Sequence, residues 1–242
     1  MIRTLASITM RSLLNRRRTL LLALASALVV LVAGLFRLSS PTESEALRFT
    51  GQLLADFGIG VVLPLVAVIV GTAAIGSEIE DGTIVYLLAK PVPRLTVTLV
   101  KFVVAWLVTC VIVVPGIWLA GIVGTGGNPG LGTAYAVAAI VGGLEYTAIF
   151  VALSLVTSRA LVVGLAYVVV WEGVVAALFA GTRLVSVRQH ALTVADAIGG
   201  QGAVSAELSV PEALIVLTLV TAIAFVIALR RLERVELRGE TG

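Results

Sequence analysis

Two carboxyl groups lie inside long apolar stretches of this chain, where they could carry protons, bind cations or accept hydrogen bonds. Glu145 falls near the middle of the apolar run 133–156, and Glu172 falls near the middle of the run 160–180. On insertion scales a charged side chain at the centre of a bilayer costs about 2.5–3.5 kcal/mol, so such residues face a protein interior or a watery cavity. No lysine or arginine lies at matching depth in the sequence, so an ion pair with either base does not account for these acids.

Two interpretations of these carboxyls stay open from the sequence. In the first, Glu145 and Glu172 are protonated and hydrogen-bond to neighbouring polar side chains inside the bundle. The neighbours considered for that role are Tyr146, Thr147 and Trp171. In the second, Glu145 and Glu172 are residues of a translocation pathway and line a route for a cationic or polar substrate.

A charged segment between the apolar runs 57–76 and 102–123 is suited to a different task, the recognition of a partner protein. Acids open this segment and Lys90 with Pro91 closes it, the charge order that a helix dipole favours. A helix as short as 78–90 is marginal in water by itself. We therefore expect it to pack against the membrane bundle on one side and against a partner on the other. Its acids are Glu78, Glu80 and Asp81, and its apolar residues are Ile84, Val85, Leu87 and Leu88.

The sequence offers little for hydrolytic or redox catalysis. The stretch 71–77 approaches the spacing of a phosphate-binding loop but lacks the lysine that contacts phosphates. One histidine, His190, and one cysteine, Cys110, cannot supply the usual ligand set of a metal cluster. We expect Cys110 to pack as a small apolar residue. We therefore predict no catalytic residue, no metal site and no cofactor bound by this chain.

The composition places the chain in the class of all-α integral membrane proteins. Hydrophobic residues make up 59% of it and charged residues 13%, against about 45–50% and about 25% in soluble domains, and its mean hydropathy is +1.11. A membrane-spanning helix needs about 20 mainly apolar residues, and six runs reach that length within a single transmembrane domain, 1–242. The expected transmembrane helices are 19–38, 57–76, 102–123, 133–156, 160–180 and 211–229.

The placement of the basic residues orients these six spans and argues against nucleic acid as a partner. The net charge is +3, but most of the 17 lysines and arginines fall on one side of the six spans. By the positive-inside bias, both termini are then cytoplasmic. The basic residues on the other side are Arg48, Arg183 and Arg188, with Arg37 at a span edge.

The segments outside the spans carry helical patterns of their own. We expect residues 1–18 to form an amphipathic interfacial helix, with an ordinary basic tail as the alternative. Arg16, Arg17 and Arg18 then act as a topogenic anchor rather than as a cleaved twin-arginine signal. The external loop 39–56 contains a helix start at Ser40 and Pro41. The external loop 181–210 carries apolar residues at helical spacing, which predicts an amphipathic helix there. Those apolar residues are Val187, Ala191, Val194, Ala195 and Ile198.

Small residues recur every four positions on the expected fifth span, at Gly173, Ala177 and Gly181. Such a face lets two helices approach closely. Packing within the chain is one explanation of this face. The other is that these three residues are part of the interface between two copies of the protein.

The charged segment resembles the signature of ABC-2 type permease subunits, which runs roughly E-x-x-x-G-T-x-x-x-L-L-x-x-P-x-x-R. The matching residues are Glu78, Gly82, Thr83, Leu87, Leu88, Pro91 and Arg94. The six spans, the amino-terminal helix and the longer last external loop match as well, so the resemblance covers nearly the whole chain. The chain is similar to compact permeases of copper-site maturation and of drug or sodium export.

This resemblance implies a multi-pass permease in a prokaryotic inner or plasma membrane. A second copy or a related permease would pair with it, and two copies of an ABC ATP-binding subunit would bind ATP and Mg²⁺. The segment 78–90 would be the coupling helix seated on that ATPase. The residues implied in coupling are Glu78, Glu80, Asp81, Gly82, Thr83, Leu87, Leu88, Pro91 and Arg94.

Three functions remain from the sequence. The leading one is the permease subunit of an ATP-driven exporter, with transport direction taken from the family alone. The second is a membrane anchor or regulatory scaffold that recruits an ATPase without moving a substrate. The third is an ion-driven carrier that uses Glu145 and Glu172 and needs no ATPase.

Overall fold

The computed structural model describes residues 2–14, 16–80, 93–200 and 202–237. These residues form helices and short connections, with no β-strand in the described ranges, which confirms the all-α class. The helices in chain order are α1 (Ile2–Leu13), α2 (Arg16–Arg37), α3 (Glu43–Leu53), η1 (Leu54–Val62), α4 (Leu63–Glu80), α6 (Arg94–Thr125), α7 (Pro129–Val156), α8 (Ala160–Ala166), η2 (Tyr167–Val175), α9 (Ala176–Leu178), η3 (Ala180–Val185), α10 (Val187–Gly199) and α11 (Val210–Leu237).

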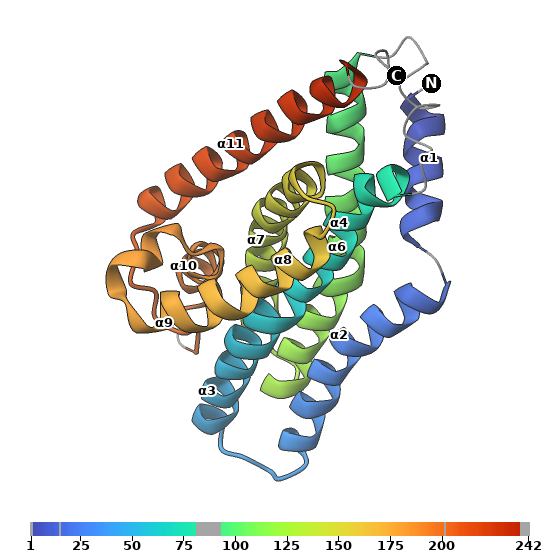
Figure 1. Cartoon of the computed structure of the whole chain (residues 1–242). Coiled ribbons are helices and arrows are strands. Elements are labelled where there is room, and N and C mark those ends of the chain that lie inside the picture. Colours follow the sequence, from blue (N-terminus) through green and yellow to red (C-terminus); the bar gives the residue numbers. More distant parts are fainter. Residues whose placement is uncertain (1, 15, 81–92, 201, 238–242) are drawn as a thin grey trace.

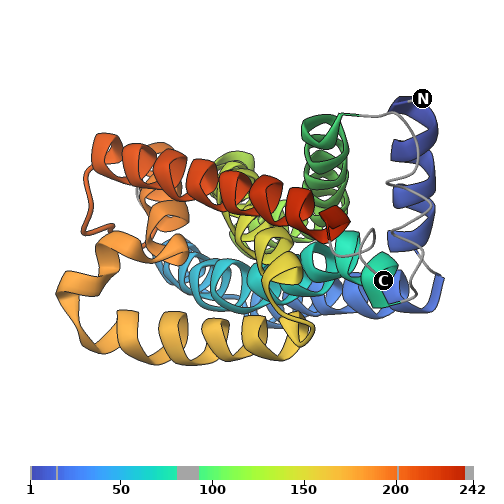
Figure 2. The same cartoon turned by 45° about the horizontal axis from the view of Figure 1, so that its top comes forward.

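The centre of the bundle is formed by α4, α6 and α7, which pack against one another (Figure 1). The helix α2 covers α6 on one side, and α11 crosses α7 at an angle on another. The run α8–η2–α9 lies on the edge opposite α11 in Figure 2. Close approach of α6 and α7 requires small residues, because a Cβ at Gly121 would lie 2.2 Å from the Cα of Gly132.

Among the described residues, five helices are long and apolar enough to cross a membrane. They correspond to the predicted spans one, two, three, four and six. The expected fifth span, 160–180, is a shorter apolar helix over Ala160–Val175, which is below the roughly 20 residues that a membrane-spanning helix needs. Three further residues form α9, and the backbone then turns extended at Phe179.

The second span begins well before the predicted residue 57. The elements α3, η1 and α4 follow one another without a break, so the candidate span Glu43–Gly76 contains 34 residues. Thr42 and Glu45 form a reciprocal capping box at its start, which satisfies two backbone donors that have no partner inside the helix. The helix start expected in the external loop is therefore confirmed, whereas most of the loop 39–56 is helix.

Two stretches of this bundle are π-helices rather than α-helices. These are η1 in the second span and η2 in the fifth, each of nine residues. Long π-helices are rare, and shorter π-bulges occur frequently at functional sites. Both stretches lie next to α10, since η1 packs against α10 and Glu172 of η2 is hydrogen-bonded to the start of α10.

The amino-terminal helix α1 is separate from α2 and packs against α6 and α4. Thr9 and Leu13 on one face are 1% and 2% exposed, while Ser7 and Arg11 on another are exposed. A separate helix is therefore present, but it ends at Leu13 and not at residue 18, and residues 16–18 belong to α2. An amphipathic, interfacial role of α1 stays a prediction.

The amphipathic helix predicted within 181–210 is α10. Val187, Ala191 and Ala195 on its apolar face are fully buried, whereas Ile198 is half exposed. This face packs against α7, α11 and η1. The helix α10 is therefore part of the bundle, and its first turn approaches both intramembrane carboxyls.

Candidate functional site

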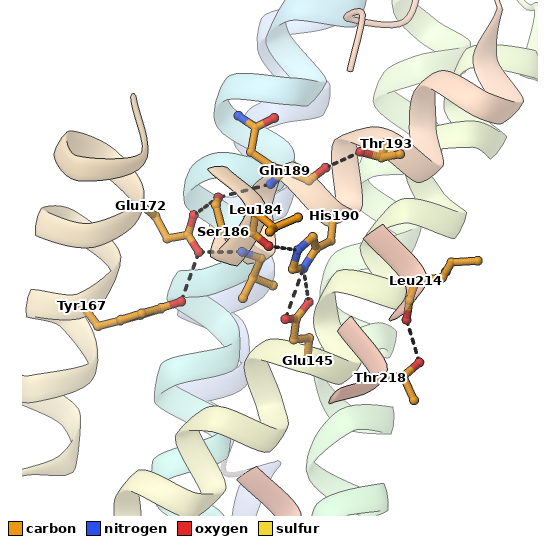
Figure 3. A network of polar contacts seen from close by, with 11 residues as sticks. Glu145, Tyr167, Glu172, Leu184, Ser186, Gln189, His190, Thr193, Leu214 and Thr218 are labelled. Atoms are coloured by element: carbon orange, nitrogen blue, oxygen red, sulfur yellow. Dashed lines mark hydrogen bonds and ion pairs between the residues drawn. The ribbon is translucent and has the colours of Figure 1, made fainter. Parts of the chain in front are cut away.

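Glu172 is bound at the amino-terminal end of α10, as Figure 3 shows. Its side chain accepts hydrogen bonds from the Val187 backbone N–H (2.9 Å), the Tyr167 hydroxyl (3.2 Å) and the Ser186 hydroxyl. Ser186 is also the N-cap residue of α10 and accepts from Gln189 N–H. All of these groups donate to the carboxyl, and the positive end of the helix dipole lies beside it. Glu172 is only 3% exposed.

Glu145 is paired with the one histidine of the chain. The Nδ1 atom of His190 lies 2.9 Å from Oε2 of Glu145, and both side chains are 0% exposed. The Nε2 atom of His190 lies 2.9 Å from the carbonyl oxygen of Leu184. A carbonyl only accepts, so Nε2 carries a hydrogen and donates it. One further proton lies between Nδ1 and the carboxyl, and the pair is neutral as a whole whichever atom holds it.

The protonated form of His190 is favoured by these contacts. Burial by itself lowers the pKa of His190, but the hydrogen bond to Glu145 and the charge of that carboxyl outweigh it, so the pKa lies above its ordinary value. The carbonyl of Leu184 and the charge of Glu172 act in the same direction. The shift therefore favours the form in which His190 holds the proton that it shares with Glu145.

Both intramembrane carboxyls thus bind one turn of one helix. We call the set Glu145, Glu172, Ser186, Val187 and His190 the α10 latch. It ties the start of α10 to α7 through Glu145 and to η2 through Glu172. Two adjoining ion pairs reinforce this region: Arg188 with Asp56 of η1 at 2.6 Å, and Arg183 with Glu207.

The polar neighbours expected for the two carboxyls are not their partners. The Tyr146 hydroxyl, the Thr147 hydroxyl and the Trp171 Nε1–H are buried without a hydrogen-bond partner in the described part of the chain. The prediction of these three as partners was therefore wrong. The true partner of Glu145 had one signal in the sequence, because His190 falls on the apolar face of the predicted amphipathic helix.

A second buried ion pair lies at the other end of the bundle. Lys101 of α6 is fully buried, and its Nζ lies 2.6 Å from Oε1 of Glu78 and 2.8 Å from the carbonyl oxygen of Ala74. Glu78 is in the last turn of α4, and α6 begins at Arg94. The pair therefore joins the two helices between which the signature segment is inserted. Nothing in the sequence predicted this pair, and Lys101 is one of the basic residues counted above as orienting the spans.

Most of the predicted coupling residues lie outside the described residues. These are Asp81, Gly82, Thr83, Leu87, Leu88 and Pro91. Of the others, Glu78 is paired with Lys101, Glu80 is the last residue of α4, and Arg94 is the first residue of α6. The structure therefore describes the two ends of the signature segment but not a coupling helix.

The three small residues of the fifth span lie in three different kinds of helix. Gly173 is exposed in the π-helix η2, Ala177 is in α9, and Gly181 is in the 3₁₀-helix η3. Because these helices differ in residues per turn, the four-residue spacing does not produce one straight stripe. A dimer contact through these residues stays a prediction.

Comparison with known families gives a match over most of the chain. Residues 14–185 match the ABC-2 family transporter proteins. The chain belongs to the ABC-2 transporter family. The match begins at the end of α1 and includes Glu78, Lys101, Glu145 and Glu172. No curated protein matches this sequence significantly.

Membership of the ABC-2 family makes this chain a multi-pass membrane protein of a transporter family. The family implies association with an ABC ATP-binding subunit. The α10 latch lies across the boundary of the matched range, since Glu145 and Glu172 are inside it and His190 is beyond Val185.

Proposed function

We propose that this ABC-2 family protein is the membrane-spanning permease subunit of an ABC exporter. A separate ATPase subunit, present in two copies, binds ATP and Mg²⁺ and drives movement of a substrate through a pair of permease chains. The pair is formed by two copies of this chain or by one copy with a related permease. The complex lies in a prokaryotic plasma membrane with both termini of the chain in the cytoplasm.

The observation that carries this proposal is the family match over residues 14–185, which spans the whole signature segment. The match accounts for the motif from Glu78 to Arg94 and for the long apolar helices together. A scaffold that recruits an ATPase without transport would share both features. Transport remains the better conclusion, since the family consists of transporter proteins.

The ion pair between Glu78 and Lys101 supports a mechanical role for the signature segment. Movement of the ATPase would act on residues between α4 and α6, and the buried pair fixes the end of α4 to α6. Since α6 also packs against α2 and α7, a displacement of the segment would be transmitted to the centre of the bundle. We propose 78–90 as the coupling helix on this basis.

The contacts of Glu145 and Glu172 do not favour the ion-driven carrier. Each carboxyl is bound by groups at the start of α10. Release of either carboxyl for ion transfer would require breaking the α10 latch. We therefore propose hydrogen-bonded, structural roles for both residues, with α10 as the element that they hold.

Co-purification tests the proposal. Tagged chain is extracted from native membranes, and wild type is compared with the double variant Glu80→Arg/Leu87→Asp. We expect a protein that contains a phosphate-binding loop to co-purify with the wild-type chain. That protein should be absent from the sample of the double variant. The matched control is Glu43→Arg, an exposed acid at the other end of the bundle, which should retain the partner. Absence of an ATPase from both wild-type and control samples would contradict the proposal.

A further inference from the structure

A cavity of about 560 Å³ lies between the start of α2, the middle of α4 and the turn between α7 and α8. Its volume falls within the range of about 300–1,000 Å³ that is typical of small-molecule sites. No residue of the α10 latch lines this cavity. Its lining residues are Arg18, Ile69, Thr72, Ala73, Gly76, Ser154, Thr157, Ser158, Arg159, Ala160, Leu161 and Val162.

The polar lining of this cavity is suited to an anion. Two guanidinium groups, of Arg18 and Arg159, line it, and no carboxylate does so among the described residues. Arg18 is held in place because its guanidinium donates to the carbonyl oxygen of Ile69. A guanidinium has five N–H donors, so this one contact leaves it further donor capacity. Planar guanidinium groups match the oxygen atoms of phosphate well.

The hydroxyl groups in the cavity are less available than the arginines as hydrogen-bond donors to a ligand. The Thr72 hydroxyl donates to the carbonyl of Val68, and the Ser154 hydroxyl donates to the carbonyl of Val151, both within their own helices. Their hydrogens are therefore already used. The two arginines remain as the main donors toward a ligand, with Ser158 of the α7–α8 turn beside them.

The apolar lining indicates where such an anion comes from. Leu161 and Val162 line the cavity and are 44% and 65% exposed on the outer surface of the bundle. Both residues belong to the apolar helix Ala160–Val175, and exposed aliphatic side chains on such a helix are suited to contact with acyl chains. The cavity therefore combines basic groups with exposed aliphatic groups in one lining. Basic pockets between membrane helices bind anionic lipid headgroups in this way.

We propose that this cavity binds the phosphate headgroup of an anionic phospholipid, with Arg18 and Arg159 as its ligands. A lipid headgroup and a soluble phosphate would make the same contacts here, between phosphate oxygens and the two guanidinium groups. The aliphatic side chains of Leu161 and Val162 add contact with the first part of an acyl chain. Binding at this site needs no ATPase partner, so it is tested separately from the proposed transport function.

Native mass spectrometry of the purified chain in detergent tests the site. The chain is titrated with phosphatidylglycerol and, separately, with zwitterionic phosphatidylcholine. Wild type should bind one phosphatidylglycerol in preference to phosphatidylcholine. Each arginine near a lipid surface contributes about a fivefold change in affinity, so Arg159→Gln should weaken binding about fivefold and Arg18→Gln/Arg159→Gln about twenty-five-fold. Arg159→Lys should retain most of the affinity.

The matched control is Arg231→Gln, which removes one exposed arginine from α11 outside the cavity and should bind phosphatidylglycerol as wild type does. Arg159 is itself exposed in a turn, so its variants test the proposal even where loss of Arg18 impairs folding. Wild-type affinity in Arg159→Gln would overturn the proposal. If inorganic phosphate displaces the lipid at concentrations as low as those at which the lipid binds, the cavity is a site for a soluble anion and not for a lipid headgroup.

Discussion

Nδ1 of His190 lies 2.9 Å from Oε2 of Glu145, although 45 residues separate the two in the chain. The contact joins α10 to the middle of α7, and neither side chain is exposed. Glu172 binds the same turn of α10. One helix therefore supplies the polar partners of both carboxyls that lie in apolar runs of the sequence.

Removal of His190 should destabilise the protein strongly. His190→Ala leaves the carboxyl of Glu145 buried without its partner, which costs about 3–5 kcal/mol when a buried pair is broken. Replacing both residues with leucine should cost much less, since apolar pairs often substitute for buried ion pairs. Thermal unfolding in detergent, analysed as a double-mutant cycle, gives the coupling energy. If the losses of stability in the single variants at Glu145 and at His190 add up to the loss in the double variant, the contact contributes nothing.

The stabilisation from His190 should depend on pH. The folded pKa of His190 is raised above its unfolded value, so its contribution is fully present below the unfolded pKa and is lost as pH rises through the folded pKa. The difference in melting temperature between wild type and His190→Gln should therefore shrink from mildly acidic to alkaline pH. A difference that grows with rising pH would contradict the assignment of a protonated histidine.

Replacing Glu172 should loosen the start of α10. Glu172→Gln replaces one acceptor oxygen with an NH₂ group that faces groups which themselves donate, at a cost of about 1–2 kcal/mol. Hydrogen exchange should accelerate at the amides of the first α10 turn and stay unchanged in α6. Assembly should stay intact. Unchanged hydrogen exchange at the amides of the first α10 turn would contradict the structural role of Glu172.

Breaking the pair at the signature segment should affect both stability and partner binding. Glu78→Gln leaves the buried Lys101 ammonium without its ion partner, which we expect to cost about 3 kcal/mol. Glu78→Gln/Lys101→Met should recover stability, because the buried charge is gone. The amount of ATPase recovered should depend on the ion pair and not on stability. The double variant should therefore recover little ATPase even though it is stable. Full ATPase recovery by the stable double variant would contradict a coupling role for the pair.

The dimer prediction is open to cysteine crosslinking. Single cysteines at Gly173 and Gly181 are introduced in a Cys110→Ala background, which removes the native thiol. Gly173 is exposed, and a Cβ at Gly181 would meet no atom within 4 Å, so both positions accept the side chain. Crosslinked dimers in native membranes are expected at one or both positions. Their absence at both would favour packing within the chain.

Most of the bundle was predictable because membrane-spanning helices are marked by length and hydropathy. The same rule missed the start of the second span, since Glu43, Glu45 and Arg48 make α3 polar. The capping box of Thr42 and Glu45 was nonetheless present in the sequence. No sequence pattern predicts the π-helices η1 and η2, because their apolar composition suits an α-helix equally well.

The polar contacts were less predictable than the helices. The partner of Glu145 lies in a segment that the six-span layout places outside the membrane, so no argument from depth could find it. The burial of Lys101 beside Glu78 depends on α4 and α6 lying side by side. Position in the sequence reveals charge and periodicity, whereas such pairs require the packing of helices that are distant along the chain.

The measurement that tests the central claim most directly is ATP hydrolysis by the co-purified ATPase subunit in liposomes, with and without this chain. The account predicts that wild-type chain changes the hydrolysis rate and that Glu80→Arg/Leu87→Asp abolishes this effect, while Glu43→Arg retains it. Equal hydrolysis rates with wild-type chain, with the coupling variant and with no chain would contradict a permease subunit coupled to that ATPase.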